Sequence, residues 1–361
     1  MAWTPPPPRA GHPYHMHDAI YAQPGALRLV LRANGATVQA AAERLRGMDR
    51  VLLAGIGTSW HATLVGELLL ARAGKLGYRV RALHSFEFAS YWPAPEARTG
   101  VIIVSHRGTK RFSLEALQKA RAAGGVGIVV TGKGSGDGLG IADLTFRTVD
   151  QESSAAHTIS YTTAMALLAA LAASLGGDDE IGHALDAIPD QLALLLGQEA
   201  WEELAARYAG RRRYYFVGGG PNRATAYEAA LKMNEANFTT AIGFECEQFL
   251  HGPWAAMGPE DVIFLVAPPG PSHERGVAIA RAAREVGTPV VALTAEGDPD
   301  LTPLAAEIIA LPEVPELLSP ILAVVPLQLF TYHLALGLGT NPDTMRTDQP
   351  AHGRALKVVG L

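Results

Sequence analysis

The sequence predicts an α/β protein built from two similar units, each a parallel β-sheet with helices on both faces. Short, nearly continuous apolar runs alternate with helical segments, which is typical of buried parallel strands joined by helices. The same order of segments occurs twice along the chain. The length of 361 residues fits two domains, since a domain commonly holds roughly 100–200 residues.

An internal repeat links the two halves. The run Val51–Gly55 corresponds to Tyr214–Gly218, which begins 163 positions later (214 − 51). Four further pairs follow in the same order at offsets of 160 to 164 positions: Glu87-Phe88 with Gln248-Phe249, Val101–Val104 with Val262–Leu265, Arg121–Ala123 with Arg281–Ala283, and Ala142–Leu144 with Ala306–Ile308. A nearly constant offset over five segments indicates a duplicated βα fold.

The loops that follow the strands are the candidate ligand-binding segments. Ligands of open parallel sheets bind beyond the carboxyl ends of the strands, and right-handed crossovers bring these loops to one edge. The candidate loops are residues 55–60, 105–113 and 151–160 in the first half, and 218–223 and 268–272 in the second.

The chain divides into four parts. Residues 1–15 are rich in proline and are expected to form a flexible tail. Residues 16–185 form the first domain, 186–345 the second, and 346–361 a C-terminal tail. Two amphipathic helices in residues 16–48 flank Pro24 and Gly35, and a linker between the halves is expected within residues 176–195.

Composition excludes several classes of protein. The net charge of −5 and the pI near 6.2 give no basic footprint for nucleic acid or a membrane surface. The single cysteine, Cys246, excludes an intrachain disulfide and a cysteine-based zinc site. The N-terminus lacks the apolar core of a signal peptide, and the most apolar window, residues 320–339, contains Pro326 and His333, which favours a buried helix. We expect a cytoplasmic protein that uses no metal and no cofactor.

The turn Gly57-Thr58-Ser59 follows the first strand and opens a helix. Glycines permit a tight turn whose N–H groups point outward, and the two hydroxyls add donors, so the segment is suited to cradle an anion. A turn without a ligand is the alternative. The corresponding segment Gly218–Asn222 has no hydroxyl and is the weaker candidate.

The loop from Ser105 to Arg111 combines hydroxyls with cations. Ser105 and Thr109 supply hydroxyls, and Arg107, Lys110 and Arg111 supply positive charge just before a helix. Such a set suits a phosphate or a carboxylate through charge-assisted hydrogen bonds. The alternative is a solvated basic turn.

The third candidate set lies on one helix of the second half. Spacings of four and three residues place Glu228, Lys232 and Glu235 on one helical face. Most such triplets are exposed salt bridges, but the apolar neighbours here indicate a cavity, where burial can turn a carboxylate into a general base. His251 follows before Gly-Pro and is either structural or a proton shuttle.

At these residues the sequence resembles the sugar isomerase (SIS) domain family, in particular the isomerase half of enzymes of the glucosamine-6-phosphate synthase type. The resemblance runs from about His17 to the C-terminus. The motifs that carry it are Gly57-Thr58-Ser59, Glu228–Glu235, His251-Gly252-Pro253, Leu327–His333 and Asp348-Gln349-Pro350. It implies two tandem flavodoxin-like subdomains and a homodimer with shared active sites.

The resemblance also implies roles for particular residues. Glu235 would move a proton between C1 and C2 of the sugar, and Lys232 would lie beside it. His251, from the neighbouring subunit, would assist ring opening, and Lys357 is the local candidate for a Schiff-base lysine. The sugar phosphate would be bound by the loops of the first half, namely Gly57, Thr58, Ser59, Ser105, His106, Arg107, Thr109, Lys110, Ala156 and His157.

The sequence departs from the family pattern at several of these positions. The family's phosphate loop reads Ser-Gln-Ser-Gly-Glu-Thr, whereas here His106, Arg107 and Lys110 replace the Gln, the second Ser and the Thr. His157 stands where the family has a serine. Lys357 lies seven residues after Pro350 instead of five, and we expect no glutaminase domain before the repeats.

Three hypotheses of function follow. The first is an isomerase or deaminase that acts on a phosphorylated amino sugar or a fructosamine-type adduct without hydrolysing glutamine. The second is a sugar-phosphate-binding regulator without turnover. The third, suggested by Arg107 and Lys110, is a SIS enzyme for an unphosphorylated or carboxylated sugar.

Overall fold

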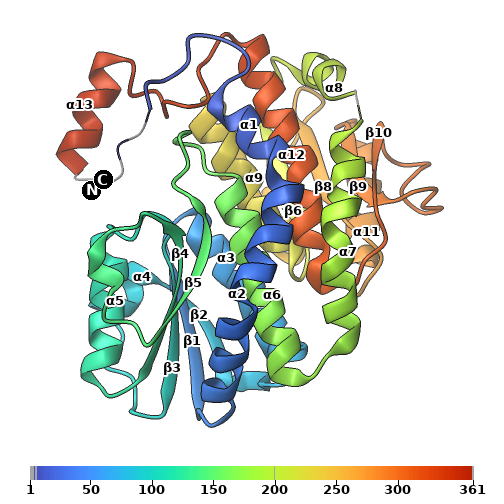
Figure 1. The fold of residues 1–361 in the computed structure, drawn as a ribbon. Coiled ribbons are helices and arrows are strands. Elements are labelled where there is room, and N and C mark those ends of the chain that lie inside the picture. The colour runs from blue at the N-terminus through green and yellow to red at the C-terminus, as the bar shows by residue number, and fades with distance from the viewer. Residues whose placement is uncertain (1–3, 5, 199, 360–361) are drawn as a thin grey trace. The chain divides into compact units, whose positions relative to one another are not determined.

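The computed structural model describes residues 4, 6–198 and 200–359 of the chain. These residues divide into two compact units. Unit 1 contains residues 22–153 and 157–189, and unit 2 contains residues 8–21, 154–156 and the chain from residue 190 onward. Each unit is an α/β domain with one five-stranded sheet (Figure 1).

The sheet of unit 1 is parallel throughout, in the order β2-β1-β3-β4-β5. Its central strands are formed by apolar, β-branched runs that are buried on both faces, as expected for a parallel sheet. The strands are β1 (Arg50–Gly55), β2 (Val80–His84), β3 (Thr99–Val104), β4 (Val126–Lys133) and β5 (Leu144–Asp150).

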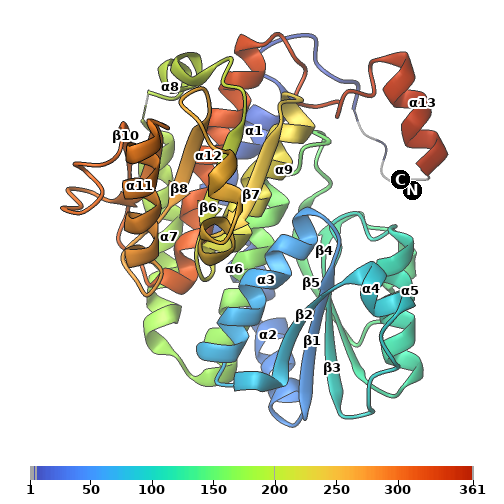
Figure 2. The same cartoon turned by 180° about the vertical axis from the view of Figure 1, so that it is seen from behind.

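Helices cover both faces of this sheet (Figures 1 and 2). One face carries α2 (Gln23–Arg46), α3 (Thr58–Arg72) and α6 (Ile159–Gly176), and the other carries α4 (Ser85–Ser90) and α5 (Arg111–Ala122). The short 3₁₀ helices of this unit are η1 (Gly77–Arg79) and η2 (Asp137–Leu139). Helix α7 (Asp179–Leu196) begins in unit 1 and ends in unit 2.

The sheet of unit 2 has the order β10-β9-β8-β6-β7 and is also parallel. Its strands are β6 (Tyr214–Gly218), β7 (Ala241–Glu245), β8 (Val262–Val266), β9 (Val290–Ala295) and β10 (Glu307–Leu311). Its helices are α1 (His15–Tyr21), α8 (Trp201–Tyr208), α9 (Asn222–Ala236), α10 (Cys246–Leu250), α11 (His273–Val286), α12 (Ser319–Gly337) and α13 (Pro350–Val359), with η3 (Pro253–Ala256) and η4 (Glu316–Leu318).

The duplicated fold predicted from the repeat is confirmed. When β1 to β5 are matched with β6 to β10 in the order of the repeat, the two sheets have the same strand order. Strands β2 and β7 are not among the apolar runs of the repeat. Both are edge strands with half-exposed positions, so neither gives a continuous apolar run.

One detail of the expected organisation is wrong: Gly35 does not separate two helices but lies inside α2, whose buried side chains pack on β5 and α6. The linker expected within residues 176–195 is helical, since α7 spans most of these residues with Pro189 inside the helix, and the boundary between the two units follows residue 189. The Pro-rich segment makes contacts of its own: His12 Nδ1 lies 2.8 Å from the Tyr332 hydroxyl, and the backbone N–H of His15 donates to Asp343 at 2.8 Å.

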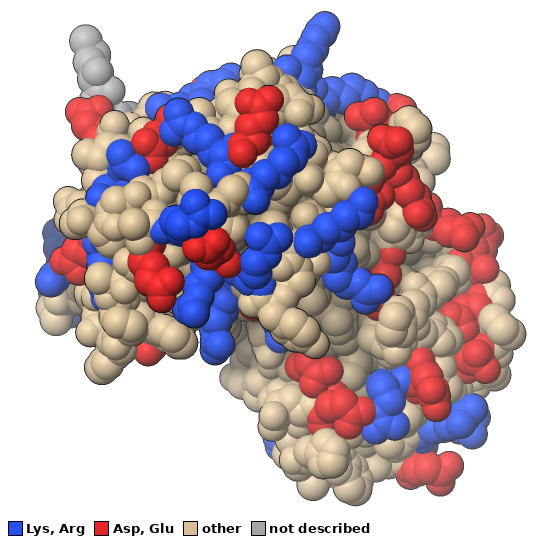
Figure 3. Space-filling model, turned by 90° about the horizontal axis from the view of Figure 1, so that it is seen from below, with Lys and Arg blue, Asp and Glu red and all other residues tan. Residues whose placement is uncertain are grey.

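Two described helices, α6 and α12, are long and apolar enough to cross a membrane, but both are mostly buried within the protein. The buried helix predicted for residues 320–339 is therefore confirmed as a core helix. On the surface, lysines and arginines are interspersed with acidic residues over the face drawn in Figure 3.

Candidate functional site

The turn after β1 needs its glycines. Gly57 has φ 56° and ψ −130°, a region that other residues rarely adopt. At Gly55 a Cβ atom would lie 2.5 Å from the carbonyl oxygen of Ser59, which is too close for any side chain. The turn thus starts α3 at Thr58 and presents the hydroxyl groups of Thr58 and Ser59 at the carboxyl end of the strand.

The loop after β3 is held by its neighbour β4. The backbone N–H of Ser105 donates to the carbonyl oxygen of Val130 at 2.9 Å, and the Thr131 hydroxyl donates to the Ser105 carbonyl at 2.7 Å. Ser105 and His106 are buried, whereas Thr109 is exposed. The loop is therefore fixed at its start and open further along.

Arg107 and Lys110 make this loop electropositive. Both side chains are half-buried. Burial, and then the charge of Arg107, lowers the pKa of Lys110. Burial also lowers the pKa of Arg107, while the charge of Glu152 opposes that shift. A bound anion would stabilise two partly desolvated cations that repel each other. This loop is therefore suited to a negatively charged group.

A buried carboxylate organises the loop after β5. Glu152 accepts hydrogen bonds from the backbone N–H groups of Thr158 and Ser160, both at 2.9 Å. Burial alone would raise the pKa of Glu152, but its electrostatic interactions with His157 and His106 and these hydrogen bonds lower it below its ordinary value. The ionised carboxylate therefore fixes the start of α6 and the position of His157.

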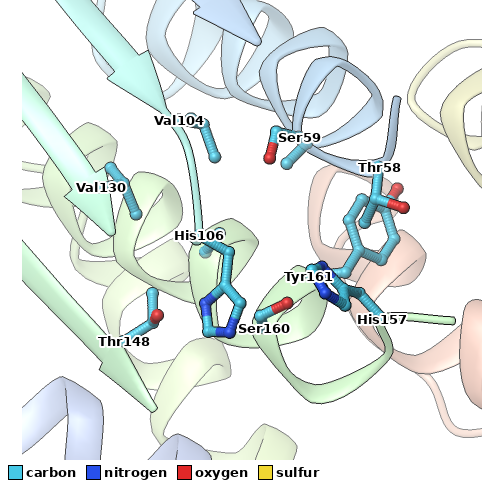
Figure 4. Close-up of a pocket in the computed structure, with 11 residues that line it drawn as sticks. Thr58, Ser59, Val104, His106, Val130, Thr148, His157, Ser160 and Tyr161 are labelled. Atoms are coloured by element: carbon cyan, nitrogen blue, oxygen red, sulfur yellow. The ribbon is translucent and has the colours of Figure 1, made fainter. Parts of the chain in front are cut away.

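These three loops enclose a small pocket in unit 1 (Figure 4). Of the predicted residues, Thr58, Ser59, His106 and His157 line it. The other lining residues were not predicted individually, although Ser160 lies in the expected loop 151–160; they are Ala62, Val104, Val130, Thr148, Ser160, Tyr161 and Ala164. Gly57, Ser105, Arg107, Thr109 and Lys110 belong to the same loops without lining the pocket, and Ala156 is a buried residue of unit 2.

In the triplet on α9 in unit 2, Glu228 and Lys232 are buried and Glu235 is partly buried. The side chains of Glu228 and Lys232 are 0% and 1% exposed, and that of Glu235 is 15% exposed. The Lys232 ammonium lies 3.5 Å from Glu228 and is ion-paired with Glu235. An exposed salt-bridge ladder does not describe this arrangement. A carboxylate held beside a buried lysine is instead suited to proton transfer.

The two remaining predicted catalytic residues are exposed. The His251 side chain is 77% exposed, and its Nε2 lies 3.3 Å from Glu247. Lys357 lies on α13, none of whose described residues is buried. The ion pairs described for Lys232 thus involve carboxylates of its own helix, and neither His251 nor Lys357 takes part in them.

Polar groups at the corresponding edge of unit 2 are used for structure. Asn222, in the turn after β6, is buried and donates to the Ser319 hydroxyl at 2.8 Å. Asp298, after β9, accepts from Thr294 at 2.6 Å and lies 2.7 Å from His273 Nε2. Burial alone would raise the pKa of Asp298, but its hydrogen bonds lower it to about 2. In the described part of the chain, no three His, Cys, Asp or Glu side chains gather as metal ligands.

The SIS domain model matches the chain twice, over residues 44–174 and 208–337. The glutamine–fructose-6-phosphate aminotransferase [isomerizing] of Thermococcus kodakarensis is 31% identical over 349 residues, which cover 94% of this chain and 58% of that protein. The enzyme of the same name from Aeropyrum pernix is 32% identical and likewise covered over 58% of its length. The chain thus spans somewhat more than half the length of these relatives.

Solved structures share the fold. The C-terminal domain of glucosamine-fructose-6-phosphate aminotransferase from Francisella tularensis superposes with a TM-score of 0.83 at 19% identity, covering 92% of this chain and 99% of that one. The tagatose-6-phosphate ketose/aldose isomerase of Escherichia coli gives a TM-score of 0.79 at 20% identity, covering 95% and 97%. At these identities the likeness concerns the fold alone.

Proposed function

The chain belongs to the SIS domain family, and on that premise we propose that it is an isomerase or deaminase of phosphorylated amino sugars or fructosamine-type adducts. The observation that carries the proposal is the buried triplet on α9, in which Lys232 holds the carboxylate of Glu235. A sensor of sugar phosphates needs no buried base. The names of the relatives, aminotransferases marked as isomerizing, support the same chemistry.

Glu235 is proposed as the base. It removes the proton from C2 of an opened 2-amino aldose, and the electron pair forms an enolamine whose aldehyde oxygen takes up a proton from water to become the C1 hydroxyl. Glu235 then returns its proton to C1, which gives a C2 iminium ion. The hydroxide left by the water adds to C2, ammonia leaves with the proton of that new hydroxyl, and a ketose remains. Lys232 stabilises the ionised carboxylate, and Arg107 and Lys110 supply positive charge for the phosphate.

The enzyme is further proposed to act as a homodimer with shared sites. The high exposure of His251 suits a residue that serves a neighbouring subunit rather than its own. Mixing Glu235→Gln and His251→Ala subunits tests this, because a mixed dimer has one site with both wild-type residues. Random mixing of such dimers would restore about a quarter of the wild-type activity. No recovery in mixed dimers, with subunit exchange verified, would contradict shared sites.

The function itself is tested by incubating the full chain with glucosamine 6-phosphate and with fructose 6-phosphate plus ammonia. Ammonia is measured by a coupled assay and sugar isomers by NMR. We expect turnover by the wild type and by Glu285→Gln, an exposed glutamate on α11, and none by Glu235→Gln. Full activity of Glu235→Gln would remove Glu235 from the mechanism.

A non-catalytic regulator is the second candidate, favoured by the cationic loop at Arg107 and Lys110. A regulator would bind these sugar phosphates in calorimetry without releasing ammonia or forming an isomer. Binding without turnover over the whole panel would select this alternative.

A further inference from the structure

Two polar side chains that line the pocket of unit 1 keep a hydrogen-bonding atom without a partner among the described residues. These atoms are Nδ1 of His106 and Oγ1 of Thr148. Both residues are deeply buried, at 7% and 2% exposed. A buried polar atom without a hydrogen-bond partner is unfavourable, so each is a position where a hydrogen bond to a ligand atom stabilises binding.

The hydrogen bonds of His106 fix which ring nitrogen carries the proton. The backbone N–H of Glu152 donates to Nε2 of His106 at 3.1 Å, so Nε2 must hold its lone pair toward that donor. Burial lowers the pKa of His106, which favours the neutral ring. The proton of a neutral ring is then on Nδ1. The unpartnered atom of His106 is therefore a donor.

The ring cannot readily turn away from the pocket. The backbone N–H of Gly132 and the side-chain amide of Gln151 both donate to the His106 carbonyl oxygen, each at 3.0 Å. A Cβ atom at Gly132 would lie 2.6 Å from Cε1 and 2.7 Å from Nδ1 of His106, so the ring occupies the space that a glycine leaves. Thr148 lies on β5, the strand beside β4, and both side chains are labelled in Figure 4.

The size and polarity of the pocket define what it accepts. Its cavity volume is about 10 Å³, room for one oxygen atom. A hydroxyl group can accept from Nδ1–H of His106 and either donate to or accept from the Thr148 hydroxyl, so a single hydroxyl pairs both atoms. The ionised Glu152 beside His106 also disfavours a second negative charge at this depth.

We propose that His106 and Thr148 form a subsite for one neutral hydroxyl group of the sugar ligand and so determine which sugar is accepted. Arg107 and Lys110, the residues proposed for the anionic group, do not line this pocket. This inference rests on the proposed function, since it requires that the pocket receive a sugar.

Calorimetry with glucose 6-phosphate and its 2-, 3- and 4-deoxy analogues tests the subsite. In the wild type we expect one analogue to bind at least about 100-fold more weakly than glucose 6-phosphate. The hydroxyl group missing from that analogue would leave two buried polar groups of the protein unpaired. In Thr148→Val and in His106→Phe the ratio of the dissociation constants of that analogue and glucose 6-phosphate should fall toward one. The variants bind glucose 6-phosphate more weakly but bind the analogue as the wild type does. Thr145→Val, on the same strand but outside the pocket, should keep the wild-type ratio.

Three outcomes would overturn the inference. If all analogues bind the wild type like the parent, the pocket holds a buried water only. If Thr148→Val weakens the parent and every analogue equally while circular dichroism shows an intact fold, Thr148 has a structural role only. If no sugar phosphate binds, the proposed function fails together with the subsite, whereas turnover of glucosamine 6-phosphate with equal affinities would refute the subsite alone.

Discussion

Replacing Glu152 by glutamine should destabilise unit 1 by about 2–4 kcal/mol. The carboxylate accepts from the N–H groups of Thr158 and Ser160 through different oxygens. Glutamine offers one oxygen and one NH₂ group, so one of the two buried N–H groups loses its acceptor, which costs about 1–3 kcal/mol. The other bond loses its charge assistance, a further cost of about 1 kcal/mol.

Hydrogen exchange of the β5 amides measures this change in unit 1 alone. Exchange of the wild type, Glu152→Gln and Glu115→Gln would be followed by mass spectrometry at neutral pH. Glu115 is paired with Arg111 on the surface of α5 at 2.7 Å, so its variant should lose about 0.5 kcal/mol or less. The comparison separates a buried carboxylate from an exposed one of the same type.

The effect of Glu152→Gln should also depend on pH in one direction. The pKa of Glu152 is lowered in the folded protein, so its contribution is complete above the unfolded value of about 4.3 and is lost as the pH falls through the folded value. The difference between the wild type and the glutamine variant should therefore shrink in acid. A loss below about 0.5 kcal/mol at neutral pH, or a difference that grows in acid, would refute the reasoning.

Three further predictions concern stability and reactivity. Asp298→Asn should lower the free energy of unfolding in urea by about 2 kcal/mol at neutral pH. The difference from the wild type should vanish as the pH falls from 3.8 toward 2, and an unchanged difference at pH 2 would contradict the pKa of about 2 for Asp298. Gly57→Ala should cost about 1–3 kcal/mol because of its positive φ, and an unchanged urea midpoint would show that the turn tolerates a side chain. Burial raises the pKa of Cys246 to about 12, so a thiol reagent at pH 8 should modify it only in denaturant; rapid labelling of the folded protein would argue against this environment.

The duplicated βα architecture could be predicted from the sequence because its buried strands recur in both halves. Segments such as Val51–Gly55 and Tyr214–Gly218 are buried on both faces and therefore appear as apolar runs in both halves. The edge strand β2 could not be found in this way, since Arg81 is exposed and the run is interrupted. Gly35 was misleading because tertiary packing of α2 outweighs the cost of about 1 kcal/mol that a glycine brings to a helix.

The residues of the candidate site that lie in loops could be predicted from the sequence. The residues brought to the site by packing of strands and helices could not. Thr58, Ser59 and His157 follow strand ends, and a parallel sheet brings such positions to one edge. Thr148 lies within a strand and looks like an ordinary β-branched residue. Its unpaired hydroxyl becomes visible only when β5, His106 and α6 are packed together.

Deuterium exchange tests most directly the claim that Glu235 transfers a proton between C1 and C2. Fructose 6-phosphate would be incubated in D₂O with the wild type and with Glu235→Gln, and the C1 protons followed by NMR. The account predicts that the wild type incorporates deuterium at C1 and that the variant binds the sugar without exchange. Exchange by Glu235→Gln at the wild-type rate, or none by a wild type that binds the sugar, would contradict it.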